Sequence, residues 1–336
     1  MLRDFVQTIR LAKGYLNEVF MNIVILDYAT LGYDLDLSGA ERFGNVIKYE
    51  KTAQHEAIER VHEADIVIVN KVKMVREVLE DAKNLKLICE TATGFDNIDI
   101  DYCRERGILV ANTPAYSSAC VAQVTVSMVC SLATHLREYE DNVSSGEYTS
   151  LGNANCLVPV YHELGGKTWG IIGFGSIGRA VARIAEAFDC KILVNKRTPV
   201  EGYECVDLDT LLKESDIITI HCPLNEQTRE MLGEREFNMM KRDAIVVNVA
   251  RGAVWDEGAV VDAVLNGKIG AIGCDVFSCE PIPKGHPFTK LFGLKNVSLT
   301  PHMAWGSYES RTRCFNTVLS NIDAYLNGEP INIVSK

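Results

Sequence analysis

The sequence predicts an α/β protein made of two Rossmann-like, doubly wound parallel-sheet domains with a cleft between them. Three observations support this prediction. Short runs of branched apolar residues with little alternation recur along the 336 residues, which indicates strands that are covered on both faces. Amphipathic helical patterns separate these runs. A glycine-rich turn joins one strand directly to one helix in the second half of the chain.

The composition is that of an ordinary globular protein and excludes several classes. Hydrophobic residues make up 47% and charged residues 24%, and the formal net charge is −11. Because binding to nucleic-acid phosphates needs clustered basic residues, we expect no nucleic-acid partner. No apolar run reaches membrane-spanning length, so we expect no membrane partner. The eleven cysteines contain no Cys-x-x-Cys pair, so we expect no metal site and reduced thiols in a cytoplasmic protein.

The domain boundaries follow from the same patterns. Residues 1–20 alternate charged and apolar side chains without a continuous hydrophobic run, so we expect an N-terminal extension, either an extra helix or an over-long start. Met21 is followed at once by a buried strand pattern. We expect a first domain over residues 21–117, completed by residues 305–336, and a second domain over residues 118–304.

The first domain alternates strands with helices. Its strand candidates are Ile23–Leu26, Val46–Tyr49, Ile66–Val69, Leu85–Cys89 and Leu109–Ala111. Helical patterns between them include Glu56–Glu63, Val72–Asp81 and Asp99–Arg106. A long helix is expected over Ser118–Asn142, as a hinge helix or a subunit contact, and a loop or arm over residues 144–159.

The second domain repeats the alternation, and polar residues follow its strands. After a first strand at residues 169–172, strands are expected at Lys191–Val194, Ile217–Ile220, Ala244–Val249, Ala271–Asp275 and Val297–Leu299. The polar residues at their ends are Asn195, His221, Arg251, Asp275 and His302. Ligands of doubly wound sheets bind beyond the carboxyl ends of the strands, so these residues are site candidates. A last helix, Ser307–Leu326, is expected to return to the first domain.

The glycine-rich turn predicts a dinucleotide-binding site in the second domain. Its residues are Gly173, Phe174, Gly175, Ser176, Ile177 and Gly178. In this Gly-x-Gly-x-x-Gly pattern the first glycine bends the chain, the second lets the backbone approach a pyrophosphate, and the third lets the helix pack closely on its strand. The amides at the start of the helix then hold the phosphates. The alternative is a tight turn without a ligand.

Three side chains at the strand ends have the chemistry of a carbonyl reductase. His302 is a natural proton exchanger near neutral pH, although a single histidine is more often a surface or core residue. A carboxylate beside an imidazole fixes its orientation and favours its charged form, and Glu280 could supply one. Arg251 stands between a small residue and a glycine, which leaves room for a substrate carboxylate. The alternative for Arg251 is a solvated loop position.

The order of these motifs resembles that of the D-isomer-specific 2-hydroxyacid dehydrogenases. The matching segments are the glycine turn, residues 249–252 (Val-Ala-Arg-Gly), residues 275–281 (Asp-Val-Phe with Glu-Pro) and residues 300–302 (Thr-Pro-His), and the similarity covers residues 21–332. The resemblance implies that Arg251 binds the substrate carboxylate and carbonyl. It further implies that Glu280 supports His302, which is the acid/base residue. Family members are typically homodimers joined through the nucleotide domain and its long helix.

The resemblance also implies further contacts and a substrate-binding role for the first domain. In this resemblance, Asp275 would hold the nicotinamide carboxamide. The other cofactor contacts would come from His221, Cys222, Pro223, Thr228, Val249, Ala250, Arg251 and His302. Substrate contacts would come from Lys71, Ala92, Thr93, Gly94, Arg251, His302 and Trp305. Lys71 could equally be a solvated surface charge.

The end of the second strand of the nucleotide domain predicts the cofactor. NAD-dependent enzymes usually carry Asp or Glu there, which bonds the ribose 2′-hydroxyl. This chain has Asn195, Lys196 and Arg197 instead. Two cations attract a 2′-phosphate that a carboxylate would repel, so we expect NADP(H) to be preferred. NAD(H) remains possible because Asn195 can bond a hydroxyl group.

The expected activity is NAD(P)H-dependent reduction of a short 2-oxo acid to the D-2-hydroxy acid. Residues 70–71, 92–95, 121–123 and 304–305 resemble glycerate dehydrogenase/hydroxypyruvate reductase members, which implies hydroxypyruvate or glyoxylate as the substrate. Formate dehydrogenases of this fold carry glutamine where Glu280 stands, so that activity is excluded. The alternative is a dinucleotide-sensing regulator that resembles the C-terminal binding corepressors, which keep the same three residues.

Overall fold

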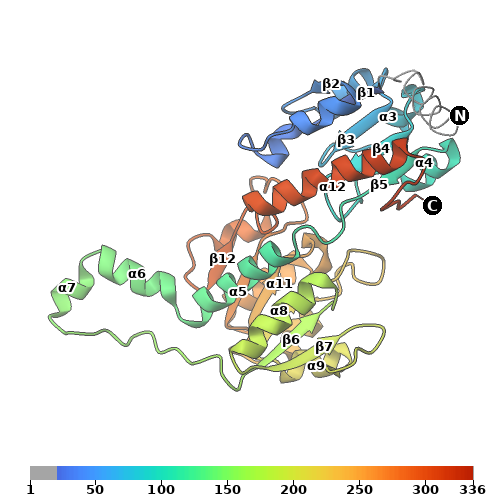
Figure 1. Ribbon diagram of the computed structural model, residues 1–336. Helices are drawn as coiled ribbons and strands as arrows, with labels where there is room; N and C mark the ends of the chain where they lie inside the picture. The colour runs from blue at the N-terminus through green and yellow to red at the C-terminus, as the bar shows by residue number, and fades with distance from the viewer. Residues whose placement is uncertain (1–20, 336) are drawn as a thin grey trace, which may run out of the picture. The chain divides into compact units, whose positions relative to one another are not determined.

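The computed structural model describes residues 21–335 and confirms an α/β fold with two parallel sheets (Figure 1). One compact unit ends at Tyr116 and resumes at Tyr308, and the other spans Ser117–Ser307. The boundaries expected from the sequence, 117/118 and 304/305, lie close to these. The expected extension over residues 1–20 lies outside the described residues.

The first unit contains a five-stranded sheet in the order β2-β1-β3-β4-β5, with every pair parallel. Its strands are β1 (Met21–Ile25), β2 (Gly44–Lys48), β3 (Ile66–Val69), β4 (Leu87–Glu90) and β5 (Leu109–Ala111). Its helices are α2 (Ala57–Val61), α3 (Arg76–Asp81), α4 (Ile100–Arg106) and α12 (Tyr308–Leu326). The strands lack alternation because both faces are buried: all four residues of β3 and of β4 are inaccessible.

Helix α3 is shorter than the predicted helix Val72–Asp81. The residues before it form a loop because the backbone amides of Lys71 and Val72 bond to the Asp27 carboxylate, at 2.6 and 3.3 Å. Met74 then pairs with Ile98 in an isolated parallel bridge. These contacts join residues far apart in the sequence, so helical periodicity alone could not predict where α3 begins.

Helix α12 belongs to the first unit and packs on its sheet. The Cys314 thiol donates to the carbonyl of Thr91 at 3.2 Å, immediately after β4. The side-chain amide of Asn321 donates to the carbonyl of Asn112 at 3.0 Å, just after β5. Beyond α12, Ile333 pairs with Ala111 in an antiparallel bridge. The end of the chain therefore completes the first unit.

The second unit contains a seven-stranded parallel sheet in the order β12-β11-β10-β9-β6-β7-β8. Its strands are β6 (Thr168–Ile172), β7 (Lys191–Asn195), β8 (Glu204–Cys205), β9 (Ile217–Ile220), β10 (Ile245–Asn248), β11 (Ala271–Cys274) and β12 (Val297–Leu299). Strand order reverses between β6 and β9, which is the ligand-binding position in doubly wound sheets. The two-residue strand β8 was not predicted.

Helices cover the sheet of the second unit (Figure 1). They are α8 (Ser176–Ala187), α9 (Leu208–Glu214), α10 (Glu234–Met239), α11 (Glu257–Leu265) and α5 (Ser118–Ala133), and α5 packs on α8, β10 and β11. Short 3-10 helices of the two units are η1 (Tyr28–Leu31), η2 (Ser38–Phe43), η3 (Gln54–Glu56), η4 (Gly252–Val254) and η5 (Pro287–Leu291).

The predicted single helix Ser118–Asn142 is wrong, because the chain turns at His135. That residue has φ +52°, in the left-handed region, and separates α5 from α6 (Leu136–Ser144). Helix α7 (Glu147–Leu151) follows inside the segment expected to be a loop. Figure 1 shows α6 and α7 extending away from the sheet of the second unit.

Among the described residues, no helix alone could cross a membrane, and only α5 and α6 together, across a 64° bend, meet the length and composition needed.

Candidate active site

The glycine turn joins β6 to α8, and packing explains two of its glycines. A side chain at Gly173 would place Cβ 2.5 Å from the amide nitrogen of Cys222, and the residue has φ +90°. A Cβ at Gly178 would lie 2.4 Å from the carbonyl oxygen of Gly173. Around Gly175, by contrast, no atom of residues 21–335 lies within 4 Å of a Cβ position. The first and third glycines therefore permit close packing, and the second leaves open space.

The start of α8 suits an anion. Gly175 is the N-cap and provides no side-chain hydrogen bond, so the first amides of this twelve-residue helix have no capping side chain. Ser176 and Ile177 form the first turn, and Phe174 is buried against Tyr203 with ring centroids 4.6 Å apart. Uncapped amides beside open space fit the pyrophosphate of a dinucleotide.

The end of β7 carries no carboxylate. Asn195 donates from its side-chain amide to the carbonyl of Val206 at 3.1 Å, and its own carbonyl accepts from the amide of Gly173 at 3.0 Å. Lys196 and Arg197 follow and are exposed. These two cations stand one strand away from the glycine turn, at the same edge of the sheet.

His221 directly follows strand β9 and contains buried polar atoms. The residue as a whole is half-buried, but both ring nitrogens are buried and have no hydrogen-bond partner among the described residues. Burial lowers the pKa of His221 to about 3, so the ring is neutral at physiological pH. In the loop that follows Cys222, the Thr228 hydroxyl donates to the carbonyl of Pro223 at 2.7 Å. A buried imidazole without a protein partner, next to Gly173, fits a site that a ligand completes.

The buried side chain of Asn248 shapes the turn that carries Arg251. Its amide donates to the carbonyl of Arg251 at 3.0 Å, and its oxygen accepts from the amide of Ala250 at 3.0 Å. Val249 is buried before the turn. Sequence reasoning missed Asn248, although an amide directly after an apolar strand is a signal for such a role.

The structure brings His302 and Glu280 together. Nδ1 of His302 lies 2.6 Å from Oε2 of Glu280, and the second carboxylate oxygen accepts from the amide of Phe277 at 3.0 Å. Both side chains are partly accessible, at 23% and 30%. Because Nδ1 faces the carboxylate, Nε2 is the ring nitrogen available for exchanging a proton with a substrate.

Asp275 holds the turn around His302. Its carboxylate accepts from the Thr300 hydroxyl at 2.6 Å and from the amides of Met303 and Ala304, both at 2.9 Å. Burial raises the pKa of Asp275, and these hydrogen bonds act in the opposite direction. His302 itself has φ +52°. Sequence reasoning did not foresee that Asp275 fixes this turn. Trp305, which follows, packs partly buried against the core.

The expected substrate residues of the first unit occupy two loops at the carboxyl edge of its own sheet. Lys71 follows β3, and its loop is held by the Asp27 carboxylate. Ala92, Thr93 and Gly94 follow β4, where the carbonyl of Ala92 accepts from the amide of Thr113 and the carbonyl of Thr93 accepts from the side chain of Asn112. Adjacent loops at one sheet edge suit a ligand.

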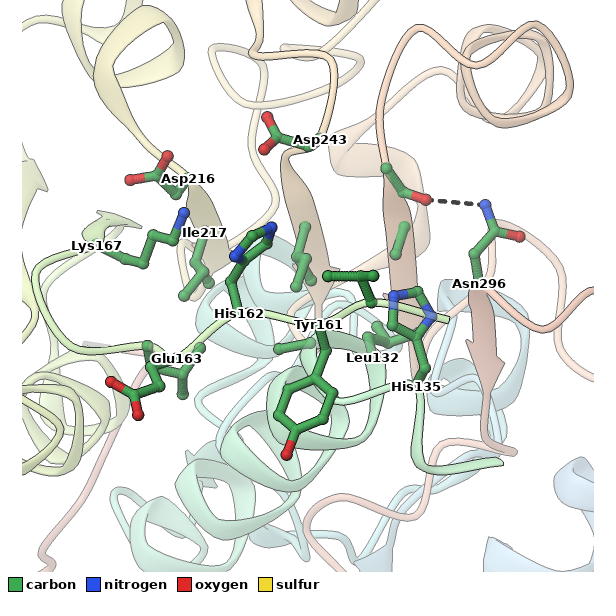
Figure 2. A pocket seen from close by; sticks show the side chains of 16 residues that line it. Leu132, His135, Tyr161, His162, Glu163, Lys167, Asp216, Ile217, Asp243 and Asn296 are labelled. Atoms are coloured by element: carbon green, nitrogen blue, oxygen red, sulfur yellow. Dashed lines mark hydrogen bonds between the residues drawn. The ribbon is translucent and has the colours of Figure 1, made fainter. Parts of the chain in front are cut away.

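A separate open pocket of about 290 Å³ lies at the opposite edge of the second sheet. Figure 2 shows His135, Tyr161 and His162 around it, together with Lys167 and Asp216. Residues at the amino ends of the strands, such as Ile217, Ile245 and Ala271, form its wall. This pocket is therefore not part of the site beside the glycine turn.

Comparison with known proteins identifies the class that this fold and site define, an enzyme that binds a nicotinamide dinucleotide. Residues 126–304 match the NAD binding domain of the D-isomer specific 2-hydroxyacid dehydrogenase family. A hydroxypyruvate reductase from Blautia hydrogenotrophica is 38% identical over 94% of this chain and 100% of its own length. A glyoxylate reductase from Thermococcus litoralis is 40% identical over 83% of this chain and 86% of its own length.

Solved structures agree with the sequence relatives. An acyclic imino acid reductase in complex with NADPH and D-Arg superimposes with a TM-score of 0.84 at 31% identity, over 94% of this chain and all of that one. The D-lactate dehydrogenase from Aquifex aeolicus, complexed with NAD and lactic acid, has a TM-score of 0.80 at 30% identity, over 94% of this chain and 99% of that one. The chain belongs to the D-isomer specific 2-hydroxyacid dehydrogenase family. The predictions of this family and of an enzyme are confirmed.

Proposed function

We propose that the protein reduces a short 2-oxo acid of the hydroxypyruvate or glyoxylate type to the D-2-hydroxy acid, with NADPH as the preferred reductant. The observation that carries this proposal is the pairing of His302 with Glu280 at 2.6 Å, at the sheet edge that also bears Arg251. An imidazole, a carboxylate and a guanidinium are the groups that a carbonyl reduction needs.

His302 acts as the general acid in this proposal. Reduced nicotinamide, when bound, supplies the hydride that reaches C2 of the 2-oxo acid. His302 gives its Nε2 proton to the carbonyl oxygen, so that the carbonyl becomes a hydroxyl group and the ring becomes neutral. Glu280 keeps the ring oriented through Nδ1 while the proton leaves Nε2.

Arg251 binds the carboxylate of the substrate and polarises the carbonyl. A guanidinium can make two parallel hydrogen bonds to one carboxylate, which fixes orientation as well as charge. Asn248 holds the backbone on both sides of this residue. We propose additional substrate contacts from Lys71, Ala92, Thr93, Gly94 and Trp305. The variant Lys71→Met tests the first of these contacts and should raise the KM for the 2-oxo acid.

The proposed preference for NADPH rests on Lys196 and Arg197. Both are exposed at the end of β7, and no carboxylate is present there to repel a 2′-phosphate. The neutral ring of His221, together with Cys222, Pro223 and Thr228, is proposed to line the same cofactor site. Asp275, Val249 and Ala250 are proposed to contact its nicotinamide end. Titration with NADPH and NADH measures the preference, and a higher kcat/KM with NADH would contradict it.

We propose a homodimer formed through the segment that follows α5. This segment exposes a series of large apolar side chains, namely Leu136, Val143, Leu151, Leu157, Val158, Val160 and Tyr161. A concentration of exposed large apolar side chains on one segment is typical of protein interfaces. Light scattering of the purified protein measures its mass, and a monomer at micromolar concentration would contradict the proposal.

We further propose a cytoplasmic location, which the eleven free cysteines support.

The deciding experiment measures kcat/KM for a panel of 2-oxo acids with each cofactor. We expect hydroxypyruvate and glyoxylate to be the best substrates and pyruvate and longer 2-oxo acids to be weaker. A preference for a longer acid would contradict the proposed substrate class. Complete inactivity of the folded protein across the panel would contradict the reductase function itself.

A further inference from the structure

Glu280 lies in the segment of residues 278–286. The first residues of this segment are exposed, yet the position of Glu280 must be accurate. Residues 275–277 are buried, whereas Ser278, Cys279 and Glu280 are exposed. A hydrogen bond of 2.6 Å between Glu280 and His302 requires that this exposed segment be held in place. Catalysis is sensitive to such placement, because a displacement of about 1 Å can cost 10²-fold in rate.

Glu257 holds this segment from outside. It is the first residue of α11, and its side chain is only 10% exposed. Oε1 of Glu257 accepts from the amide of Ser278 at 2.8 Å, and Oε2 accepts from the Ser278 hydroxyl at 2.6 Å. One carboxylate therefore takes both donors of a residue two positions before Glu280. The start of a helix also favours the negative charge of this carboxylate.

The same carboxylate contacts the far end of the segment. Nε2 of His286 lies 2.9 Å from Oε2 of Glu257, in a close electrostatic contact rather than an aligned hydrogen bond. The imidazole is 5% exposed, and its Nδ1 accepts from the amide of Phe288 at 3.3 Å, so Nε2 carries a proton. Glu257 thus contacts Ser278 and His286, which flank Glu280 on both sides.

The segment that Glu257 holds also contacts the turn that carries Arg251, the proposed substrate-binding arginine. A Cβ at Gly252 would lie 2.0 Å from the carbonyl carbon of Phe277 and 2.3 Å from the amide nitrogen of Ser278. The residue after Arg251 is therefore in direct backbone contact with the segment that Glu257 holds.

We propose that Glu257 is a positioning residue of this enzyme, which aligns Glu280 with His302 by holding Ser278 and His286. Glu257 acts through these residues and not on the substrate. The proposal rests on the proposed function, in which His302 gives a proton to a 2-oxo acid.

The test replaces Glu257 by alanine and compares this variant with Glu280→Gln and with the double variant. Glu257→Ala should lower kcat for the best 2-oxo acid by roughly 10- to 100-fold, because Glu280 is no longer held beside His302. The dissociation constant for NADPH should change by less than about twofold, since the contacts of Glu257 are with Ser278 and His286 and not with the proposed cofactor residues. The control is Glu234→Ala at the start of α10. The Glu234 side chain is 78% exposed and contacts Lys268 at 3.4 Å. The kcat of this control variant should stay at the wild-type value.

Two readouts separate positioning from a general structural role. The double variant should be only slightly slower than Glu280→Gln alone, because both changes remove the same support of His302. Glu257→Gln, which keeps an oxygen acceptor for the Ser278 amide, should recover part of the kcat that Glu257→Ala loses.

Additive losses in the double variant, or a kcat of Glu257→Gln no higher than that of Glu257→Ala, would overturn the proposal. If Glu257→Ala does not fold, Ser278→Ala removes one of the two bonds and should give the same pattern with a smaller loss of kcat. An inactive wild type would instead overturn the proposed function. An active wild type with a kcat unchanged in Glu257→Ala would overturn only the role of Glu257.

Discussion

The buried imidazole of His221 should make the stability of the ligand-free protein depend on pH. Both ring nitrogens are buried without a partner among the described residues, and burial lowers the pKa of His221 from 6.5 to about 3. Because the pKa is lower in the folded state, the unfolded chain binds a proton that the folded chain does not bind between these two values. The contribution of the neutral ring to stability is therefore complete above pH 6.5 and is lost as the pH falls toward 3.

The size of this loss follows from the two pKa values. Relative to pH 7.5, the free energy of unfolding should fall by about 1 kcal/mol at pH 5.5 and about 3 kcal/mol at pH 4.5, because each pKa unit corresponds to about 1.4 kcal/mol. The full loss, reached below pH 3, is about 5 kcal/mol, which is comparable to the whole stability of many small domains.

Urea unfolding of the wild type and of His221→Leu measures this effect. Leucine is apolar and does not titrate, so it should remove this part of the pH dependence. The difference in unfolding free energy, wild type minus variant, should decrease by about 1 kcal/mol between pH 7.5 and pH 5.5. Taking the difference cancels the titration of carboxylates that both proteins share. Parallel curves for the two proteins over this range would refute the reasoning.

Three further predictions concern the proposed chemistry and a buried acid. His302→Gln should lower the reduction rate by roughly 10²–10⁴-fold with NADPH binding kept, and unchanged turnover would contradict the role of His302. Arg251→Lys keeps the charge but loses the two-pronged geometry, so it should raise KM for the 2-oxo acid and lower kcat; a defect in cofactor binding alone would contradict its role. Burial raises the pKa of Glu90 well above its usual range, so the folded state keeps a proton that the unfolded state loses above about pH 4.5. Wild-type stability should therefore fall relative to Glu90→Gln as the pH rises from 4 to 7 in urea unfolding, and a constant difference would contradict the raised pKa.

The strands and the glycine turn could be predicted because their causes are local. Strands such as β3 and β9 match their predictions residue for residue, since a strand buried on both faces needs an unbroken apolar run. The glycine pattern is equally local, because close approach of backbone at Gly173 and Gly178 excludes any side chain there.

Other features depend on contacts between distant residues and could not be predicted. The break at His135 lies inside an apolar pattern that continues from Leu132 to Leu136, so periodicity gives no sign of it. The start of α3 depends on Asp27, more than forty residues earlier. The contact of Glu257 with His286 likewise joins two residues that have no distinctive sequence context.

Asp275 illustrates how the structure narrows a role that the family resemblance implies. A left-handed conformation costs a residue other than glycine roughly 1–2 kcal/mol, and His302 adopts it with φ +52°. Hydrogen bonds from Thr300, Met303 and Ala304 to the Asp275 carboxylate offset this cost. A carboxylate has about four lone-pair sites, and these donors occupy all but one of them. Asp275 can therefore accept at most one further donor from a nicotinamide carboxamide while it keeps His302 in place.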